Sequence, residues 1–431
     1  MSDHDTIDLS PPAAPLSRRA LLAAAAAAAG TAVVATMPEA LRGQQAAVAV
    51  AATPTPIVIP ADPTKQLGLP TSAIGERSPF VNMVRTPTGV VSGSSLTPIH
   101  QITGTIIPAD LQFERHHAGV ALIDPDKYQL LIHGLVEQPL TFSLADLKSL
   151  PSITRPHFLE CAGNGRGGYK NAKPDATPQA VDGMLGNSEW TGVPVKLLLN
   201  ETGVKSGAEW ALAEGGDAAL LSRSVPVSKL MDDAFLAYAQ NGEPLRPAGG
   251  YPVRLILPGW EGNMNIKWIR RLELNREPNM SKDETSRYSD PLPNGTARQF
   301  SFEMDAKSTI LYPTSPVQLS KPGWVQISGL AWSGRGKITA VDVSVDGGTT
   351  WFEAELQTVA SSKAALRFTH MWNWDGRETR ILSRATDETG YTQPSLDVYR
   401  ATRGPGTEYH YNHTRSWVIK TDGTVVYGDV V

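Results

Sequence analysis

The first regular pattern of apolar and polar residues covers residues 128–136, where it predicts a β-strand that ends in a turn. A short helix is expected over residues 144–150. Ser143 can accept a hydrogen bond from the first helical turn, and Pro151 ends the helix because it cannot continue the hydrogen-bond pattern. This part of the chain therefore combines a strand and a helix.

Two further elements follow in the same half of the chain. Residues 195–202 contain three consecutive leucines and predict another short helix, which ends at Gly203. Residues 253–257 predict a compact apolar strand. Strands and helices do not alternate regularly here, so we expect a mixed α+β domain rather than a doubly wound parallel sheet.

The pattern changes after about residue 300 to one of short, half-buried strands. Residues 341–346 alternate between apolar and polar side chains and are followed by a two-glycine turn at 347–348, as in a hairpin. Residues 325–329 and 381–385 repeat this strand pattern at the spacing of a sandwich. The C-terminal part is therefore expected to form an immunoglobulin-like β-sandwich.

Length and charge limit the possible classes of protein. With 431 residues the chain can form two or three domains, and 41% hydrophobic and 19% charged residues are typical of a globular protein. The net charge of −4 gives no electrostatic reason to expect nucleic acid as a partner. No basic amphipathic run points to a membrane surface.

The N-terminus has the pattern of an export signal. Residues 17–22 place paired arginines before an alanine-rich stretch, as in a twin-arginine signal, so we expect a signal peptide over residues 1–51 and a periplasmic protein. A short membrane anchor is the alternative, but alanine is weakly hydrophobic and the run is broken early. Residues 52–100, rich in Pro, Thr, Ser and Gly, are expected to form an extended or partly disordered arm. Because twin-arginine export usually carries folded proteins, the signal also hints at a cofactor.

Cys161 is the only cysteine, which excludes several cofactor classes. One cysteine can form no internal disulfide. It also cannot provide the C-x-x-C-H attachment of a c-type haem or a multi-cysteine zinc site.

Cys161 lies in the segment with the strongest chemical signal, residues 157–168. The cysteine follows an apolar strand and opens a glycine-rich loop, where backbone N–H groups can approach an anion or a bulky cofactor. Arg166 can lower the pKa of the thiol and hold an oxyanion. Thiolates suit soft metals, so this segment is a candidate metal site.

Two other readings of this segment remain. Residues 163–168 match the dinucleotide fingerprint G-x-G-x-x-G, but the sequence from Tyr169 onward cannot open the helix that a pyrophosphate needs. An isolated cysteine can also be buried and inert, although the neighbouring arginine and glycines make this less favoured.

Two further clusters carry cations. Residues 113–117 contain Arg115 beside two histidines, which lack a third zinc ligand at a recognised spacing, so anion recognition is favoured over zinc binding. The third cluster places Arg254 and Lys267 on either side of a strand and loop. Taken alone, that pair is more typical of a solvated surface.

Taken together, these clusters resemble the sulfite oxidase family of molybdopterin enzymes. Within this family, residues 115–117, 259–264 and 283–286 look most similar to the bacterial SoxC-type sulfane/sulfite dehydrogenases. The resemblance covers roughly residues 105–430. It rests on an ordered series of motifs: F-x-R-x-H at 113–117, C-A-G-N at 161–164, G-Y-P-V-R at 250–254, I-K-W at 266–268, V-D-V-S-V-D-G-G at 341–348 and R-A-T-D-E-T-G at 384–390. One departure is Gly165, since family members often carry an arginine directly after C-A-G-N.

The resemblance implies a molybdopterin-binding domain at residues 101–300 and an immunoglobulin-like dimerisation domain at residues 301–431. It implies that Cys161 binds molybdenum. The implied cofactor-binding residues are Phe113, Arg115, His117, Asp217, Arg254, Asn265, Ile266 and Lys267. The implied catalytic residues of the anion pocket are Arg115, Arg166, Trp190, Tyr288 and Arg403.

The function implied by the resemblance is oxidation of sulfite, or of a carrier-bound sulfane, to sulfate. Arginines suit this anionic substrate because they form charge-assisted, bidentate hydrogen bonds. The chain has no haem motif, so a separate c-type cytochrome is expected to accept the electrons, and a homodimer or a complex with the cytochrome is expected. Two alternatives remain: a related molybdopterin reductase of methionine sulfoxide or nitrate, and a non-enzymatic binding module on the same fold.

Overall fold

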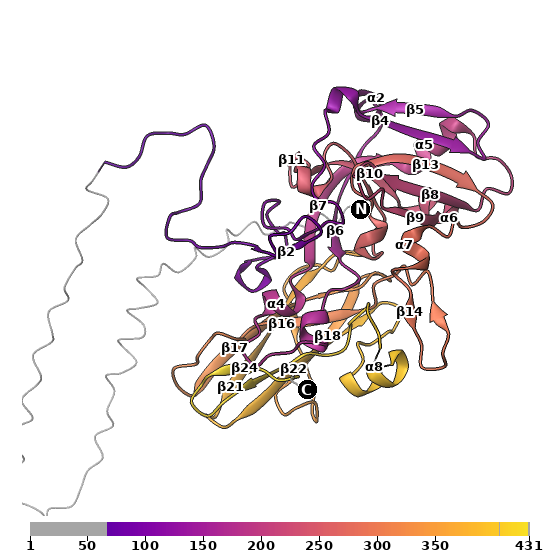
Figure 1. The fold of residues 1–431 in the computed structure, drawn as a ribbon. Helices are drawn as coiled ribbons and strands as arrows, with labels where there is room; N and C mark the ends of the chain where they lie inside the picture. Colours follow the sequence, from indigo (N-terminus) through magenta and orange to yellow (C-terminus); the bar gives the residue numbers. More distant parts are fainter. Residues whose placement is uncertain (1–66, 405, 430–431) are drawn as a thin grey trace, which may run out of the picture. The chain divides into compact units, whose positions relative to one another are not determined.

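The structure is a computed structural model that describes residues 67–404 and 406–429 (Figure 1). The expected signal peptide and the first part of the expected arm, residues 52–66, lie outside the described residues. Residues 67–76 belong to a separate unit of the chain, and the sheets and helices lie in the unit formed by residues 77–431. In the described part of the chain, no helix is long and apolar enough to cross a membrane.

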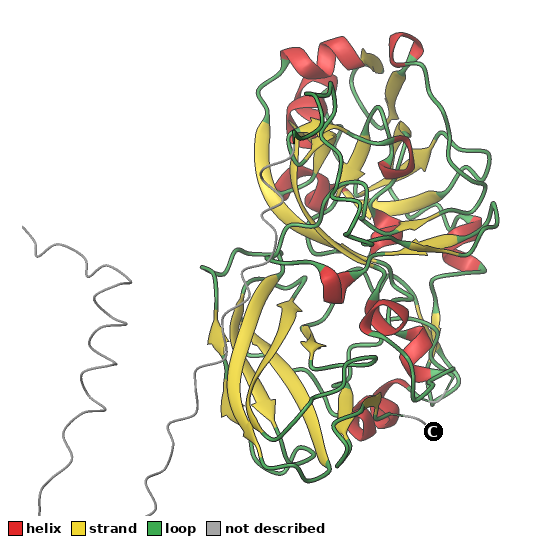
Figure 2. Cartoon of the chain, turned by 90° about the vertical axis from the view of Figure 1, so that its left-hand side faces the viewer, coloured by secondary structure: helices red, strands yellow, loops and turns green. Residues whose placement is uncertain are grey.

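Strands dominate both halves of this unit, and short helices join them (Figure 2). In the first half, β4 and β13 run parallel while the other paired strands are antiparallel. One sheet has the order β5-β4-β13-β8-β9, with β4 Gln129–Gly134, β5 Leu140–Ser143, β8 Trp210–Gly215, β9 Ser222–Pro226 and β13 Ile269–Asn275. The other has the order β11-β10-β7-β6, with β12 paired to β10, and consists of β6 Ile153–Glu160, β7 Leu185–Pro194, β10 Phe235–Gln240, β11 Glu243–Pro244 and β12 Arg254–Ile256.

The remaining elements of this half are short. A small sheet joins β1 Thr86–Pro87, β2 Ser94–Leu96 and β3 Glu114–Arg115, and β14 Asp290–Pro291 pairs with β15 Ala297–Arg298. The α-helices, including the last one in the second half, are α2 Leu144–Ser149, α3 Arg166–Tyr169, α4 Pro178–Asp182, α5 Val195–Thr202, α6 Val227–Asp232, α7 Lys282–Thr285 and α8 Leu396–Arg403. The 3-10 turns are η2 Ile99–Gln101, η3 Pro125–Lys127, η4 Pro247–Gly249 and η5 Gly262–Met264. Strands β1 and β2 come from the expected N-terminal arm, so its later part is paired with the first cationic motif.

The predicted elements of the first half form where the pattern indicates. Strand β4 lies within residues 128–136, and Ser143 caps α2 by accepting a hydrogen bond from the amide of Asp146. Helix α5 covers residues 195–202 and ends at Gly203, and β12 lies within residues 253–257. Helix α3 ends at Tyr169, so the glycine-rich segment forms only a single helical turn.

The second half is a sandwich of two antiparallel sheets. One has the order β16-β17-β21-β20, with β16 Lys307–Tyr312, β17 Gly323–Trp332, β20 Glu355–Leu356 and β21 Leu366–Trp374. The other has the order β19-β18-β22-β23-β24, with β18 Ile338–Ser344, β19 Phe352–Glu353, β22 Thr379–Asp387, β23 Ser416–Ile419 and β24 Val425–Tyr427. Buried side chains of both sheets form one core that includes Ile327, Phe368, Val341 and Ile381. The expected α+β fold followed by a β-sandwich is confirmed.

The two halves meet at the end of β6, the strand that leads to Cys161. The amide of Phe158 in β6 donates to the carbonyl of Lys363 in the sandwich half. The amide of His410, in the segment after α8, donates to the carbonyl of Ala162 at 2.8 Å. The loop that carries Cys161 is therefore enclosed by both halves of the unit.

Candidate functional site: a cationic cavity around Cys161

One cavity in the first half brings together side chains from widely separated segments. It is lined from β3, from the loop after β6, from the segment 246–268 and from Tyr288. The predicted site residues that line it are Phe113, Arg115, His117, Cys161, Asp217, Arg254, Asn265, Ile266, Lys267 and Tyr288. The fold thus gathers ten of the predicted residues around one space.

Cys161 is held by its backbone at the point where β6 ends. Its amide donates to the carbonyl of Met184 at 3.1 Å, and its carbonyl accepts from the amide of Asn164 at 2.8 Å. A Cβ atom on Gly262 would lie 3.2 Å from the Cα of Cys161, so this glycine permits η5 to pack against the cysteine backbone. Burial raises the pKa of the thiol, and the positive charges of Arg115 and Arg166 oppose that rise. A bound metal would hold the group as a thiolate.

Arg254 is buried and Lys267 is half-buried in the cavity wall, and neither pairs with a carboxylate. Arg254 donates to the carbonyls of Gly249 and Asn265, both at 2.9 Å, and burial lowers its pKa to about 9. Lys267 donates to the carbonyl of Arg115 at 3.1 Å, and burial together with the charge of Arg254 holds its pKa well below the ordinary value. Glu114 and Asp217 also line the cavity and act on Lys267 through their charges, but neither Arg254 nor Lys267 forms an ion pair with a carboxylate in the described part of the chain. A buried charge is costly without a partner, so the wall is suited to an anionic ligand.

Arg115 adds a third positive charge at the same cavity. Its guanidinium contacts the carbonyl of His116, and it too forms no ion pair with a carboxylate among the described residues. Glu114 is directed elsewhere, because its carboxylate lies 3.0 Å from His116 Nε2 and 3.4 Å from Arg85. The charge of Arg115 therefore stays available to a ligand.

His117 and Tyr288 form a hydrogen-bonded pair in which the direction of donation can be inferred. Burial, followed by the charge of Arg115, lowers the pKa of His117 to about 4, so the ring is neutral near pH 7. Its Nδ1 contacts the guanidinium of Arg287, which can only donate, and so Nε2 carries the proton and donates to Tyr288 Oη at 3.0 Å. Burial, with the negative charge of Cys161, raises the pKa of Tyr288. The hydroxyl group of Tyr288 therefore stays protonated and can donate a hydrogen bond to a ligand.

Three predicted residues lie outside the cavity lining. Arg166 pairs with Glu408 at 3.3 Å, although a Cβ on Gly163 would lie 3.6 Å from Arg166 Nη2 and 4.0 Å from Cys161 Sγ. Arg166 thus flanks the cysteine, but part of its charge is balanced.

Trp190 and Arg403 make structural contacts instead of lining the predicted anion pocket. Trp190 is fully buried, donates to the carbonyl of His157, and has the guanidinium of Arg254 5.4 Å from its ring centre. Arg403 pairs with Asp290 at 3.4 Å and Asp305 at 3.1 Å. An arginine balanced by two carboxylates lacks the free charge that an anion pocket requires, so the structure assigns Arg403 to an ion-pair cluster instead.

Asn265 lines the cavity, but its side chain supports the backbone. Its Oδ1 accepts from the amide of Leu257 at 2.7 Å, and its Nδ2 donates to the carbonyls of Trp260 and Glu261. It orients Arg254 through its own carbonyl oxygen. Its predicted contact with a cofactor can therefore be made only by the backbone.

Sequence reasoning missed several lining residues. Arg85 comes from the expected arm, and nothing in the local pattern there distinguishes it from a surface residue. Gln112 and Gln240 also line the cavity, and Gln112 Oε1 accepts from Gln240 Nε2 and from Ser188, both at 2.7 Å. A buried glutamine pair of this kind has no periodic sequence signal, because its members come from unrelated segments.

These residues fit a molybdopterin. A single cysteine beside three unpaired cations offers one soft ligand for the metal and positive charge for the phosphate of the pterin. When it is bound, this cofactor supplies the two-electron redox chemistry. Arg254 and Lys267 would hold its phosphate, and Cys161 would bind its metal. The fold and the site thus define a molybdopterin oxidoreductase with one protein thiolate.

Comparisons with known proteins agree with this class. Residues 117–282 match the oxidoreductase molybdopterin binding domain, and residues 298–416 match the Mo-co oxidoreductase dimerisation domain. The chain is similar in structure to the sulfane dehydrogenase SoxCD from Paracoccus pantotrophus, with a TM-score of 0.82 and 42% identity over 88% of this chain and 100% of that chain. The chain belongs to the sulfite oxidase family of molybdopterin oxidoreductases, as the resemblance predicted.

Two other relatives show how far the similarity extends. Mitochondrial sulfite oxidase of Mus musculus is 30% identical over 315 residues, which cover 68% of this chain and 58% of that protein. The NADH nitrate reductase of Cichorium intybus is 31% identical over 368 residues, which cover 75% of this chain and 39% of that protein. The chain thus spans little more than half the length of the sulfite oxidase and less of the nitrate reductase. The predicted molybdenum-molybdopterin cofactor is confirmed at the level of the family.

Proposed function

We propose that the protein is a molybdenum-dependent dehydrogenase that oxidises sulfite, or a carrier-bound sulfane sulfur, to sulfate. The observation that carries this proposal is the position of Cys161 in a cavity with Arg115, Arg254 and Lys267, three cations without carboxylate partners. The similarity to a sulfane dehydrogenase over the full length of its matched chain supports a sulfur substrate. In the reaction, sulfite and water give sulfate, two protons and two electrons.

The side chains of the cavity would bind and orient the anionic substrate. Arg115 provides a fixed positive charge, and guanidinium groups bind oxyanions through paired, charge-assisted hydrogen bonds. The hydroxyl group of Tyr288 would donate a hydrogen bond to a substrate oxygen, because the Tyr288 oxygen already accepts one from His117. Arg166 would contribute less than Arg115, since Glu408 balances part of its charge.

The proposal extends to partners and location. The two electrons would pass singly to a separate c-type cytochrome, because the sequence, with its single cysteine, contains no C-x-x-C-H haem motif. Residues 298–416 match a dimerisation domain, which supports a homodimer or a complex with the cytochrome. The twin-arginine pattern at residues 17–22 supports export to the periplasm.

Nitrate reduction is the second candidate. The similarity to a nitrate reductase favours it, and a cationic cavity also suits nitrate. Methionine sulfoxide fits less well, because a neutral sulfoxide gains little from three cations. The direction of electron flow separates these reactions.

The test compares the purified mature protein with its Cys161→Ser variant. Molybdenum and pterin contents are measured first, and sulfite-dependent reduction of cytochrome c is then compared with nitrate-dependent oxidation of a reduced viologen dye. We expect near-stoichiometric molybdenum and sulfite turnover in the wild type, with turnover lost in the variant. Nitrate turnover without sulfite turnover would establish the second candidate. Absence of molybdenum from protein made in cells that synthesise the cofactor would overturn both.

A further inference from the structure

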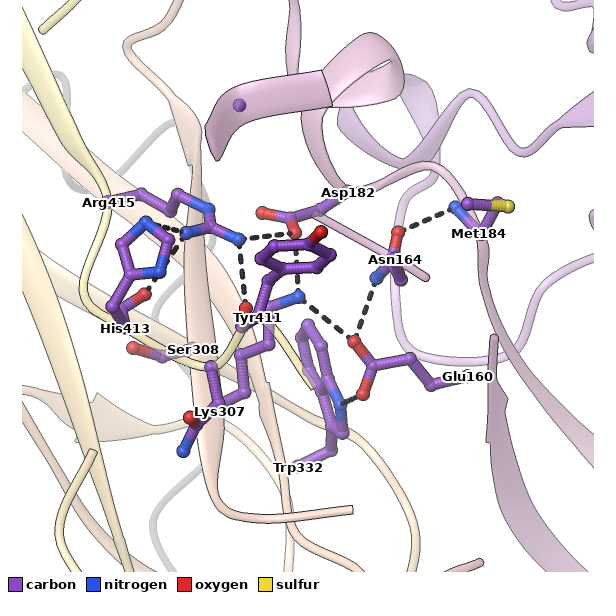
Figure 3. Close-up of polar contacts among 12 residues, drawn as sticks. Glu160, Asn164, Asp182, Met184, Lys307, Ser308, Trp332, Tyr411, His413 and Arg415 are labelled. Carbon is purple, nitrogen blue, oxygen red and sulfur yellow. Dashed lines mark hydrogen bonds and ion pairs between the residues drawn. The ribbon is translucent and has the colours of Figure 1, made fainter. Parts of the chain in front are cut away.

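A second group of buried charges lies beside the Cys161 loop, where the sandwich packs against the first half (Figure 3). Lys307, at the start of β16, lies 2.9 Å from Glu160 Oε1 and 2.7 Å from Asp182 Oδ1. Arg415 lies 3.6 Å from the same Asp182 oxygen. All four side chains are at most 1% exposed, so this buried ion cluster joins the two halves of the unit away from water.

Glu160 is the member closest to the metal site, because it directly precedes Cys161. Its Oε1 accepts from Lys307 and from Asn164 Nδ2, both at 2.9 Å, and its Oε2 accepts from Trp332 Nε1 at 2.6 Å. Lys307 and Trp332 face each other across β16 and β17. One cross-strand pair of the sandwich therefore holds both oxygens of the carboxylate that precedes the cysteine.

The loop after the cysteine is held from the same side. Asn164 joins the Glu160 carboxylate to the amide of Met184, which donates to Asn164 Oδ1 at 3.0 Å. Met184 in turn accepts from the amide of Cys161 at 3.1 Å. A Cβ atom on Gly165, whose φ is +97°, would lie only 2.2 Å from Arg415 Nη2. The guanidinium of Arg415 thus occupies the space that a side chain at position 165 would need.

The cluster is balanced in charge without help from a ligand. It contains two carboxylates and two cations, and burial together with Arg415 holds the pKa of the adjacent His413 well below its ordinary value, so that ring is neutral. Burial raises the pKa of Asp182, but Lys307 and Arg415 outweigh it, and the pKa stays below its ordinary value. The cluster therefore has no need of an anion, and its role lies in what it holds in place.

We propose that Lys307, Trp332 and Arg415 are positioning residues for the metal-binding cysteine. They act through Glu160, Asn164 and Gly165, which fix the backbone on both sides of Cys161 and so the direction of its sulfur. The sandwich is then part of the metal site as well as a domain for assembly. This inference rests on the proposed function only in assuming that Cys161 binds the metal.

The experiment uses three full-length variants. Lys307→Met removes the cation between Glu160 and Asp182, and Trp332→Phe removes a single hydrogen bond to Glu160 while the aromatic ring remains. The matched control is Lys363→Met, which removes an ion pair of 2.6 Å between the sandwich and Asp233 that does not touch residues 160–165. Trp332→Phe is the milder change and keeps the test valid if Lys307→Met does not fold.

Three quantities are measured on each loaded protein: molybdenum content, the electron paramagnetic resonance spectrum of the one-electron-reduced metal, and kcat and KM for sulfite. We expect the spectrum to shift in Lys307→Met and Trp332→Phe, with kcat about 10-fold lower and KM unchanged, because residues that orient a metal ligand typically change activity by that order. Lys363→Met should match the wild type. A folded, loaded Trp332→Phe protein with the wild-type spectrum would overturn the proposal.

A readout independent of the metal uses the fact that Cys161 is the only cysteine. The rate at which iodoacetamide labels the full-length chain prepared without cofactor reports on this thiol alone. We expect faster labelling in Trp332→Phe and Lys307→Met than in the wild type and Lys363→Met, and equal rates would count against the positioning role. If the wild type bound no molybdenum, the proposed function would fail, while the labelling rates would still decide whether the sandwich positions Cys161.

Discussion

The cavity wall and the buried ion cluster hold cations of the same kind in opposite circumstances. In the cavity, Arg254 is buried and Lys267 is half-buried, neither pairs with a carboxylate, and burial lowers the pKa of both. In the cluster, Lys307 lies within 3 Å of two carboxylates, and it is even more deeply buried than the cavity cations. Burial alone therefore does not distinguish a ligand site from a structural one.

The two regions differ in charge balance: the cations of the cavity have no paired carboxylate, whereas those of the cluster do. A buried cation without a carboxylate destabilises the folded chain until an anion binds, whereas a balanced cluster is complete when the chain folds. The cavity is thus built for an anionic cofactor, and the cluster is built to hold Cys161. Variants that remove one charge or one contact at a time should separate these two kinds of region.

The largest effect is expected for Arg254→Met. Removing a cation that would hold the phosphate of the cofactor should lower the molybdopterin content and sulfite turnover per protein by about 100-fold, within the range found for groups that support a metal site. In the cofactor-free protein the same change should not lower the free energy of unfolding, because it removes an unpaired buried charge. Cofactor content and urea unfolding check both parts. The control is Arg384→Met, which breaks an ion pair with Asp342 in the sandwich and should retain the cofactor.

The reverse pattern is expected for Lys307→Met. This change leaves Glu160 buried without a cation and leaves Asp182 with Arg415 alone, so the free energy of unfolding should fall by about 3 to 5 kcal/mol. Arg384→Met, which removes a partly exposed ion pair, should cost at most about 1 kcal/mol. Urea unfolding measures both. Equal losses in the two variants would contradict the distinction between a buried cluster and a surface pair.

A smaller effect is expected for Gly165→Ala, compared with Gly242→Ala. Both glycines have positive φ, +97° and +79°, but nothing lies within 4 Å of a Cβ on Gly242. The left-handed backbone should cost each variant about 1 to 2 kcal/mol. Gly165→Ala should cost roughly 1 to 3 kcal/mol more, because its methyl group must displace Arg415. Identical unfolding free energies would show that Arg415 does not pack closely against Gly165.

The smallest effect concerns the protonation of His117. In the cofactor-free protein its pKa is lowered to about 4, so between pH 6.5 and 4 the unfolded chain binds more protons than the folded one. Stability should therefore fall as the pH decreases through this window, and His117→Gln should flatten that fall. NMR titration should also show a higher pKa of His117 once an anionic cofactor balances Arg115. The pKa of His413, beside the balanced cluster, should not respond to the cofactor.

Local sequence patterns predicted much of the fold. The caps of α2 and the end of α5 at Gly203 follow from side-chain and backbone preferences within a few residues. The alternation at residues 341–346 likewise predicts a strand whichever sheet it joins. Among the predicted site residues, Arg403 differs most from its prediction, since the motif resemblance assigned it to the anion pocket. Its charge is balanced by Asp290 and Asp305, and both carboxylates are far from it in sequence.

The sequence by itself determined the class of fold, the single cysteine and the cationic motifs that belong to the family. Only the tertiary structure decided which cations are free to bind a ligand, because charge balance depends on neighbours that the chain brings together from distant positions. It placed Arg254 and Lys267 without carboxylates, and it placed Lys307 between Glu160 and Asp182. The same residue type thus has a ligand-binding role in one place and a positioning role in the other, because local sequence specifies the charge and the fold specifies its partners.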